Sequence, residues 1–172
     1  IDETPLLSMW IIGLLFLVFC SIRYLDLLSV IGGIICVLAI LFVAFEDMLS
    51  LLPFLLIITF LILYLVSQSI QKSADELVWE DHFIIFDTLA LLLVYFGGNY
   101  FVVREMSVEM MHLNLAEGED IPFAWLFYSL TFLIPVGYLA WGVLKKSIMF
   151  LRVGLMVLAL SVITIKYYYS LG

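Results

Sequence analysis

Asp87 is the residue of this sequence whose type and position most clearly suit it for chemistry. It lies inside the apolar run HFIIFDTLALLLVYFGGNYFVVR, residues 82–104, which is long enough to cross a membrane as a helix. A carboxylate inside the membrane is costly, and it commonly marks a proton site, a cation site or a substrate contact. With about 1.5 Å of rise per residue, we expect Asp87 roughly 6–8 Å below the membrane surface.

Two tyrosines on neighbouring apolar runs, Tyr64 and Tyr138, are expected at about the same depth as Asp87. Pro135 lies just above them, and its ring frees the backbone carbonyl of Thr131 one turn earlier. The sequence therefore predicts a polar layer in the inner third of the membrane, suited to a substrate or an ion. The shallow depth favours the alternative, in which Asp87 stays hydrated near the interface or simply forms a hydrogen bond with a tyrosine.

The second candidate is Gly97-Gly98-Asn99, in the far half of the same run. Broken helices at this depth often expose backbone groups to substrates and ions, which makes Asn99 a candidate contact. The alternative is structural: the glycines allow close helix packing, and Asn99 forms a hydrogen bond with a neighbour. Because these residues and Pro135 are expected at different depths, the pattern favours the structural alternative.

The third candidate is an acidic group formed by Glu105, Glu109 and His112. Glu109 and His112 have the i, i+3 spacing of helical carboxylate–histidine metal ligands. Di-iron sites need that motif twice, together with two further glutamates, whereas this chain carries it once. We therefore interpret residues 104–120 as an amphipathic surface segment with a solvated acidic face, and these three residues as weak candidates for a metal site.

The composition identifies the class of protein that must hold these residues. Of the 172 residues, 66% are hydrophobic and 13% are charged, against roughly 45–50% and about 25% in soluble domains. The charges fall in short groups between apolar runs long enough to span a bilayer, which indicates helices rather than the alternating strands of a β-barrel. Cys20 and Cys36 lie inside such runs and are expected to be small packing residues.

The predicted fold is all-α: a single polytopic membrane domain, a bundle of about six transmembrane helices, with the lipid bilayer as its surroundings. Pro53 lies in the first turns of the third span, where a missing N–H costs least. Small residues at i, i+4 in the second span, such as Gly32 and Cys36, either allow close contact with another helix or are an incidental pair. The expected spans are residues 6–24, 27–45, 48–67, 82–103, 121–144 and 148–168.

Lysine and arginine predict the orientation of such a chain, because they favour cytoplasmic loops. With the amino terminus outside, the inner loops contain five of these cations and the outer side contains two. We therefore expect both termini outside. The acidic start, Asp2-Glu3, does not fit a signal peptide, and a chain that begins with Ile1 has been processed or is a piece of a longer protein.

Several functions are disfavoured by the residues present. There is no basic patch for nucleic acid, and no HExxH, GxSxG or P-loop motif. No span has a histidine near its middle, so haem ligation within the chain is not expected, and we expect no cofactor.

The stretch RVGLMVLALSVITIKYYYSLG, Arg152 to Gly172, combines a cation, a leucine-rich run and a tyrosine cluster at the exit. It resembles the span ends of multispanning bacterial membrane proteins classified as domains of unknown function. The resemblance implies a bacterial cytoplasmic membrane and no particular activity.

The first functional hypothesis is a non-enzymatic subunit or scaffold, packing as a homo-oligomer or with a partner membrane subunit. The alternatives are a small transporter or channel-like protein using Asp87, and a membrane-embedded enzyme acting on lipids.

Overall fold

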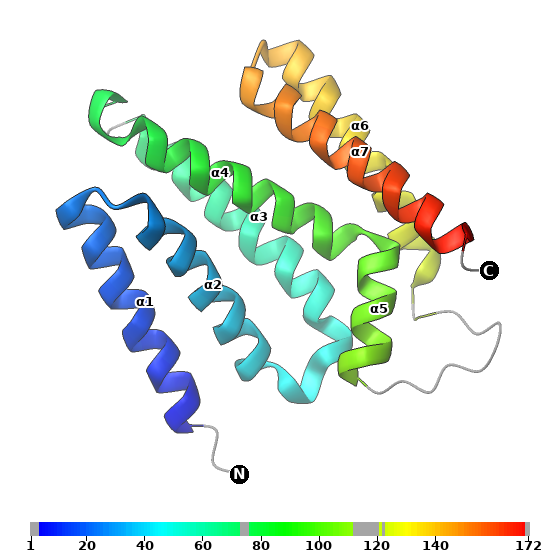
Figure 1. The fold of residues 1–172 in the computed structure, drawn as a ribbon, viewed down its shortest axis with the longest axis horizontal. Helices are drawn as coiled ribbons and strands as arrows, with labels where there is room; N and C mark the ends of the chain where they lie inside the picture. Colours follow the sequence, from blue (N-terminus) through cyan, green and yellow to red (C-terminus); the bar gives the residue numbers. More distant parts are fainter. Residues whose placement is uncertain (1–3, 73–75, 112–120, 122, 171–172) are drawn as a thin grey trace. The chain divides into compact units, whose positions relative to one another are not determined.

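The computed structural model describes residues 4–72, 76–111, 121 and 123–170, and within these ranges it contains α-helices and no strand. The predicted all-α class is confirmed. Figure 1 shows the helices in chain order. They are α1 (Thr4–Tyr24), α2 (Leu27–Ala44), the short 3-10 helix η1 (Glu46–Leu51), α3 (Leu52–Gln71), α4 (Glu76–Gly98), α5 (Tyr100–Met111), α6 (Ala124–Lys145) and α7 (Ile148–Ser170).

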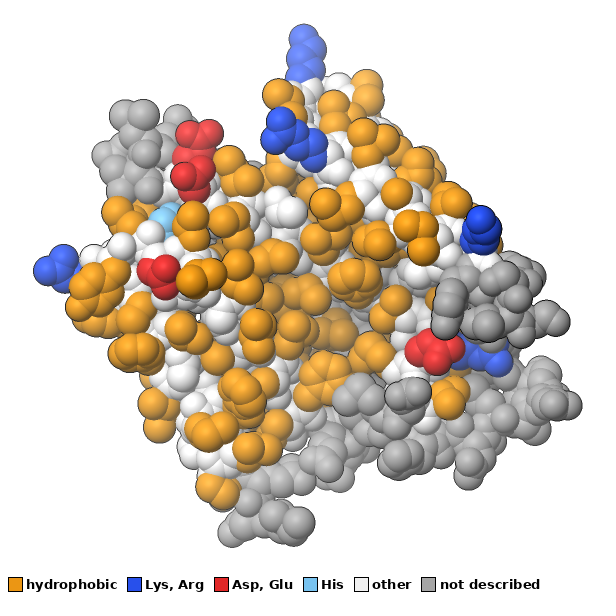
Figure 2. Space-filling view, viewed as in Figure 1, with side chains coloured by type: hydrophobic (Ala, Val, Ile, Leu, Met, Phe, Trp, Pro, Cys, Tyr) orange, Lys and Arg blue, Asp and Glu red, His pale blue; other side chains and the backbone are white. Residues whose placement is uncertain are grey.

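Six of the described helices are long and apolar enough to cross a membrane, as the sequence predicted. Hydrophobic side chains cover most of the face seen in Figure 2, and the charged side chains lie mainly towards helix ends. Such a surface would be poorly soluble in water and is suited to lipid. The six candidate spans are Pro5–Tyr24, Leu27–Ala44, Leu52–Gln71, Trp79–Gly98, Ala124–Lys145 and Ile148–Lys166.

The fourth predicted span differs from the observed helix. The span was predicted over residues 82–103, with Gly97-Gly98-Asn99 as a candidate break, and in the structure α4 ends at Gly98 and a separate helix, α5, begins at Tyr100. The fourth span therefore begins earlier, at Trp79, and stops at the glycine pair. Hydropathy alone does not reveal this break, because the apolar residues continue from α4 into the first turn of α5.

The chain divides into two compact units, residues 1–90 and 91–172. The boundary falls inside α4. Unit 1 contains α1, α2, α3 and the first part of α4, around a core that includes Leu52, Leu56 and Phe60. Unit 2 contains the end of α4 with α5, α6 and α7, and its core includes the fully buried side chains of Tyr95 and Val157.

In unit 1, α1 and α2 form a closely packed hairpin. A Cβ atom added at Gly32 would lie 3.1 Å from a methyl carbon of Leu17, and one added at Gly13 would lie 3.6 Å from the sulfur of Cys36. The small residues of α2 thus face α1, as their spacing predicted. Both Cys36 and Cys20 are free thiols.

The turn of this hairpin is fixed by Asp26, which caps the amino terminus of α2. Its carboxylate accepts a hydrogen bond from the backbone N–H of Ser29 at 3.0 Å and a longer one from Leu28 at 3.4 Å. The hydroxyl of Ser29 donates to the same carboxylate, and this bond is the main reason why the pKa of Asp26 is lower than its usual value. A charged carboxylate at this position satisfies helix N–H groups that would otherwise lack partners.

In unit 2, α6 and α7 form a second hairpin, with backbones in close contact at two glycines. A Cβ atom at Gly142 would lie 3.0 Å from the backbone nitrogen of Leu151, and one at Gly154 would lie 3.1 Å from that of Leu139. The helix end of α6 is closed by Lys146, whose φ of 54° is in the left-handed region. The turn is therefore short enough to bring the two helices together immediately.

Candidate functional site

The centre of the candidate site in unit 1 is Asp87, whose side chain is 2% exposed. Two glutamines from the end of α3 hold one of its oxygens. The Gln68 Nε2 atom donates to Asp87 Oδ2 at 2.8 Å, and the Gln71 Nε2 atom donates to the same oxygen at 2.7 Å. The other oxygen, Oδ1, is enclosed and accepts no hydrogen bond from the residues that the structure describes.

Ser67 and Tyr64, also on α3, complete the surroundings of this carboxyl group. The hydroxyl of Ser67 accepts a hydrogen bond from Gln71 Nε2 at 3.2 Å, and it also lies beside the carboxyl group of Asp87. Tyr64 is half-buried and close enough to Asp87 for electrostatic interaction. The structure therefore brings together two of the residues predicted to form the polar layer, Asp87 and Tyr64.

The position of Asp87 along α4 agrees with a site inside the span. Asp87 follows the exposed residue Asp81 by six residues, which corresponds to about 9 Å along the helix. At this depth an ionised carboxylate needs strong compensation, and two amide donors on one oxygen supply part of it.

The glutamine pair suits either protonation state of the carboxyl group. A glutamine amide carries both a donor and an acceptor, and a half-turn about its terminal bond exchanges them. With the NH₂ groups facing Asp87, as here, the site stabilises the carboxylate. With one carbonyl turned towards Asp87, it would accept the hydrogen of a protonated carboxyl group. Binding and release of a proton would then require the rotation of one glutamine amide and no helix movement.

Asn99, the second sequence candidate, lies in unit 2 at the break between α4 and α5. It is fully buried, and its Nδ2 atom donates to the hydroxyl of Tyr95 at 2.6 Å. Its Oδ1 atom accepts from the backbone N–H groups of Phe101 at 2.9 Å and Val102 at 3.5 Å. Asn99 is thus the N-cap of α5, and both ends of its amide are used within the fold.

The glycines before Asn99 also serve packing. A Cβ atom at Gly98 would lie 2.6 Å from a methyl carbon of Ile134 on α6. The backbone of α4 therefore approaches α6 at a distance that only glycine permits without a shift of that side chain. This geometry supports the structural alternative for Gly97-Gly98-Asn99.

Pro135 and Thr131 form a second hydrogen-bonded group in unit 2. The carbonyl of Thr131, which Pro135 leaves without its usual helical donor, accepts a hydrogen bond from the Ser161 hydroxyl of α7 at 3.4 Å. The Thr131 hydroxyl donates to the carbonyl of Phe127 at 2.8 Å and accepts from the backbone N–H of Tyr100 at 2.9 Å. The freed carbonyl was predicted from the sequence, and here it joins α6 to α7.

Tyr138, the third residue of the predicted polar layer, belongs to unit 2 and also has a partner there. Its hydroxyl donates to the backbone carbonyl of Leu91 at 3.0 Å. This bond connects α6 with the last turns of α4. The geometry supports a structural role for the hydroxyl group.

The acidic candidates for a metal site are only partly covered by the structure. Glu105 is exposed on α5, Glu109 lies in the same helix with a side chain outside the described set, and His112 lies outside the described residues. Among the side chains that the structure describes, no group of three metal-ligating residues occurs.

Sequence reasoning missed Gln68, Gln71 and Ser67 as partners of Asp87. A signal was present, because these polar residues lie in the last turns of α3, and α4 returns after a short connection. Residues close to the connection on both helices of a hairpin are near each other in space. His82 was also passed over. It is 8% exposed, and both of its ring nitrogens are enclosed, with no hydrogen-bond partner among the described residues.

Comparisons with protein-family models, with curated proteins and with solved structures found no match for this chain.

Proposed function

We propose that this chain is a small transporter or channel-like membrane protein in which Asp87 is a proton or cation site. The observation that carries the proposal is the environment of the carboxyl group in unit 1. Two amide donors hold one oxygen, while the other is enclosed and accepts no hydrogen bond from any described residue. A purely structural carboxylate would be expected to have both oxygens satisfied, because an unsatisfied buried acceptor costs about 1–3 kcal/mol, and more when it is charged.

The proposed setting follows from the sequence. The protein resides in a bacterial cytoplasmic membrane with both termini outside, so that the end of α3 and the start of α4 lie at the inner surface. Asp87 would then exchange its proton or cation with the cytoplasmic side.

The first test is infrared spectroscopy of the reconstituted protein between acidic and neutral pH. Every titrating carboxyl group of the chain adds to the carbonyl band of the difference spectrum, and the component from Asp87 should appear and disappear reversibly and be lost in Asp87→Asn. Asp26→Asn is the matched control, because Asp26 lies outside the spans, and it should keep the band. If the wild type and Asp87→Asn give the same difference spectrum, Asp87 does not exchange a proton and only the cation form of the proposal survives.

The second test is flux into proteoliposomes driven by a membrane potential or a pH gradient, with protons and alkali cations followed separately. Asp87→Asn should abolish the flux or uncouple it from protons, while Asp26→Asn should not. Flux of both ion classes that is unchanged by Asp87→Asn would refute the proposal.

A second candidate function is a non-enzymatic helical subunit or scaffold, as a homo-oligomer or with a partner membrane protein. It is favoured by unit 2, in which the buried side chains of Asn99, Thr131 and Ser161 all take part in hydrogen bonds between or within helices. Native mass spectrometry of protein extracted gently from its own membrane tests it. A stoichiometric second polypeptide or a fixed homo-oligomer would support this function, and a lone chain would count against it.

A further inference from the structure

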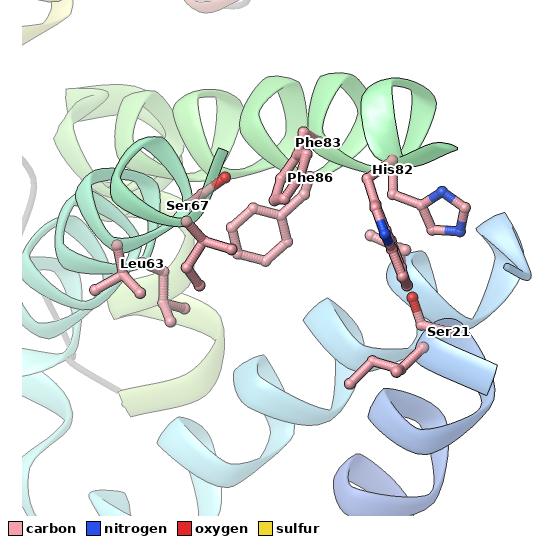
Figure 3. A pocket seen from close by; sticks show the side chains of 11 residues that line it. Ser21, Leu63, Ser67, His82, Phe83 and Phe86 are labelled. Carbon is pink, nitrogen blue, oxygen red and sulfur yellow. The ribbon is translucent and has the colours of Figure 1, made fainter. Parts of the chain in front are cut away.

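Unit 1 contains a pocket with a volume of about 550 Å³ next to the Asp87 site. This size is within the roughly 300–1,000 Å³ of typical small-molecule sites. Figure 3 shows side chains from α1, α3 and α4 around it, with Phe83 and Phe86 extending from α4. The lining residues are mostly apolar: Ser21, Ile22, Val30, Leu63, Val66, Ser67, Ile70, Trp79, His82, Phe83 and Phe86.

The pocket is accessible from the apolar surface of the unit. Three of its lining residues are largely exposed, Ile22 at 62%, Val66 at 48% and Ile70 at 52%. All three lie in candidate membrane spans, so their exposed side faces lipid. A molecule already dissolved in the membrane can therefore reach the pocket directly.

Ser67 connects the pocket to the carboxyl group of Asp87. It lines the pocket, its hydroxyl accepts from Gln71, and it lies beside the carboxyl group itself. A ligand in contact with Ser67 is thus separated from Asp87 by a single side chain. None of the described residues that line the pocket is lysine or arginine. The nearby ionisable carboxyl group therefore favours a positive ligand over a negative one.

The aromatic side chains that α4 contributes to the pocket also favour a positively charged ligand. Trp79, Phe83 and Phe86 all line the pocket, and the π faces of such rings attract cations, tryptophan most strongly. His82 packs edge-on against Trp79, with ring centroids 5.4 Å apart, and its enclosed nitrogens do not open onto the pocket. The ligand would thus be held by apolar contact, ring faces and charge.

We infer that this pocket binds lipophilic monovalent cations, such as quaternary ammonium or phosphonium compounds that partition into the membrane. The inference rests on the proposed function of Asp87 and specifies the substrate class of that site. The apolar body fills the space between the α1–α2 hairpin and the α3–α4 hairpin of unit 1. The positive centre lies towards Ser67, where Asp87 supplies the opposite charge.

The test compares two probes of the same shape and opposite charge, tetraphenylphosphonium and tetraphenylborate. Binding is measured by calorimetry on the whole chain in nanodiscs, with protein-free nanodiscs to subtract partitioning into lipid. We expect saturable binding of the phosphonium ion and none of the borate. Equal binding of the two ions would overturn the inference, because it would show that the pocket does not distinguish charge.

Two variants separate the contributions of the aromatic ring and of the carboxyl group to phosphonium affinity. Phe86→Leu removes a ring face but keeps an apolar wall, and it should lower phosphonium affinity by roughly 2- to 30-fold. Asp87→Asn should lower affinity about tenfold or more, since at an effective dielectric constant of about 20 even a separation of about 12 Å gives a tenfold effect. Phe132→Leu, at an exposed position of unit 2, is the matched control and should not change affinity.

If Asp87→Asn fails to fold by circular dichroism and gel filtration, Leu63→Trp replaces it. This change fills the pocket from α3 and should abolish phosphonium binding. Phosphonium affinity that neither Phe86→Leu nor Leu63→Trp alters would overturn the inference. So would native mass spectrometry that finds a phospholipid retained in stoichiometric amount, with no phosphonium adduct.

The outcomes also separate this inference from the function on which it rests. A carboxyl band that titrates and disappears in Asp87→Asn, together with no phosphonium binding, would overturn the substrate class and leave the proton site standing. Phosphonium binding that depends on Phe86 but not on Asp87 would overturn the role of the carboxyl group in ligand binding, and with it the proposed use of Asp87 as a cation site.

Discussion

Substitution of Gly142 by alanine tests whether the α6–α7 hairpin depends on backbone contact. The new Cβ atom would lie 2.9 Å from Leu151 Cγ and 3.0 Å from the backbone nitrogen of the same residue. A side-chain tip can rotate away, but a backbone nitrogen moves only with its helix. We therefore expect α6 and α7 to separate locally in Gly142→Ala.

Two opposing effects determine the size of the change. Overpacking of a well-packed interface typically costs about 1–3 kcal/mol. Replacing glycine by alanine in a helix contributes about 1 kcal/mol in the other direction. The net loss in the free energy of unfolding should therefore be about 0–2 kcal/mol.

The same helix provides the control that isolates the packing effect. A Cβ atom at Gly137 would meet nothing within 4 Å. Gly137→Ala should therefore show only the gain in helix propensity, up to about 1 kcal/mol. The difference between the two variants, about 1–3 kcal/mol, measures the cost of close contact alone.

The assay is reversible unfolding of the purified protein in mixed micelles, with helix content followed as the denaturing detergent is increased. Gly154→Ala, on the opposite side of the hairpin, should behave like Gly142→Ala, because its Cβ atom would lie 3.1 Å from the backbone nitrogen of Leu139. If Gly142→Ala is as stable as Gly137→Ala, the two helices are not held in backbone contact and this reasoning is wrong.

Three further predictions concern hydrogen bonds and helix ends, and the same unfolding assay measures the first two. Thr131→Val removes a buried hydroxyl that accepts a hydrogen bond from a backbone N–H of α5, so it should lower the free energy of unfolding by about 1–3 kcal/mol. Thr131→Ser keeps the hydroxyl and should lose much less, and equal losses in the two variants would contradict the hydrogen bond. Lys146→Gly should raise the free energy of unfolding by about 1 kcal/mol, because the φ of 54° at Lys146 suits glycine. Lys145→Gly, inside α6, should lower it, and the reverse order would exclude the left-handed cap. Asp26→Ala should lower the thermal midpoint at neutral pH, because the charged cap binds the N–H of Ser29. Because the pKa of Asp26 is lowered from 3.8 in the folded protein, this stabilisation is complete above that value and is lost as the pH falls below it. The thermal midpoints of the wild type and Asp26→Ala should therefore converge in acid, and a difference that widens there would contradict the cap.

The features predicted correctly from the sequence are those that depend on local pattern. Apolar runs identified the six candidate spans, because a span must satisfy its backbone groups within itself. Pro53 lies in the first turn of α3, where its missing N–H is harmless, and the small residues of α2, including Gly32, face the neighbouring helix. The freed carbonyl behind Pro135 also follows from local geometry, although the donor from α7 does not.

The features that were missed depend on contacts between helices. The polar residues in the last turns of α3 are a signal for partners of Asp87. That Gln68 and Gln71 are the donors depends on how the two helices pack, since 19 and 16 residues separate them from Asp87 along the chain. The end of α4 was only partly expected. The sequence offers Gly97-Gly98-Asn99 as a candidate break, whereas the cap that Asn99 forms for α5 is seen only in the structure.

The hydrogen bond between Ser161 and the carbonyl of Thr131 has a consequence for biosynthesis. When α6 has left the ribosome and α7 has not, this carbonyl has neither its helical donor nor the serine hydroxyl, and in lipid an unsatisfied carbonyl is costly. The α6 segment also has a mean hydropathy of 1.6 against 2.4 for α7, so it is the weaker of the two as an independent insertion signal. The two helices should therefore leave the insertion machinery as a pair, with α6 held in its aqueous channel until the chain has been made beyond residue 161.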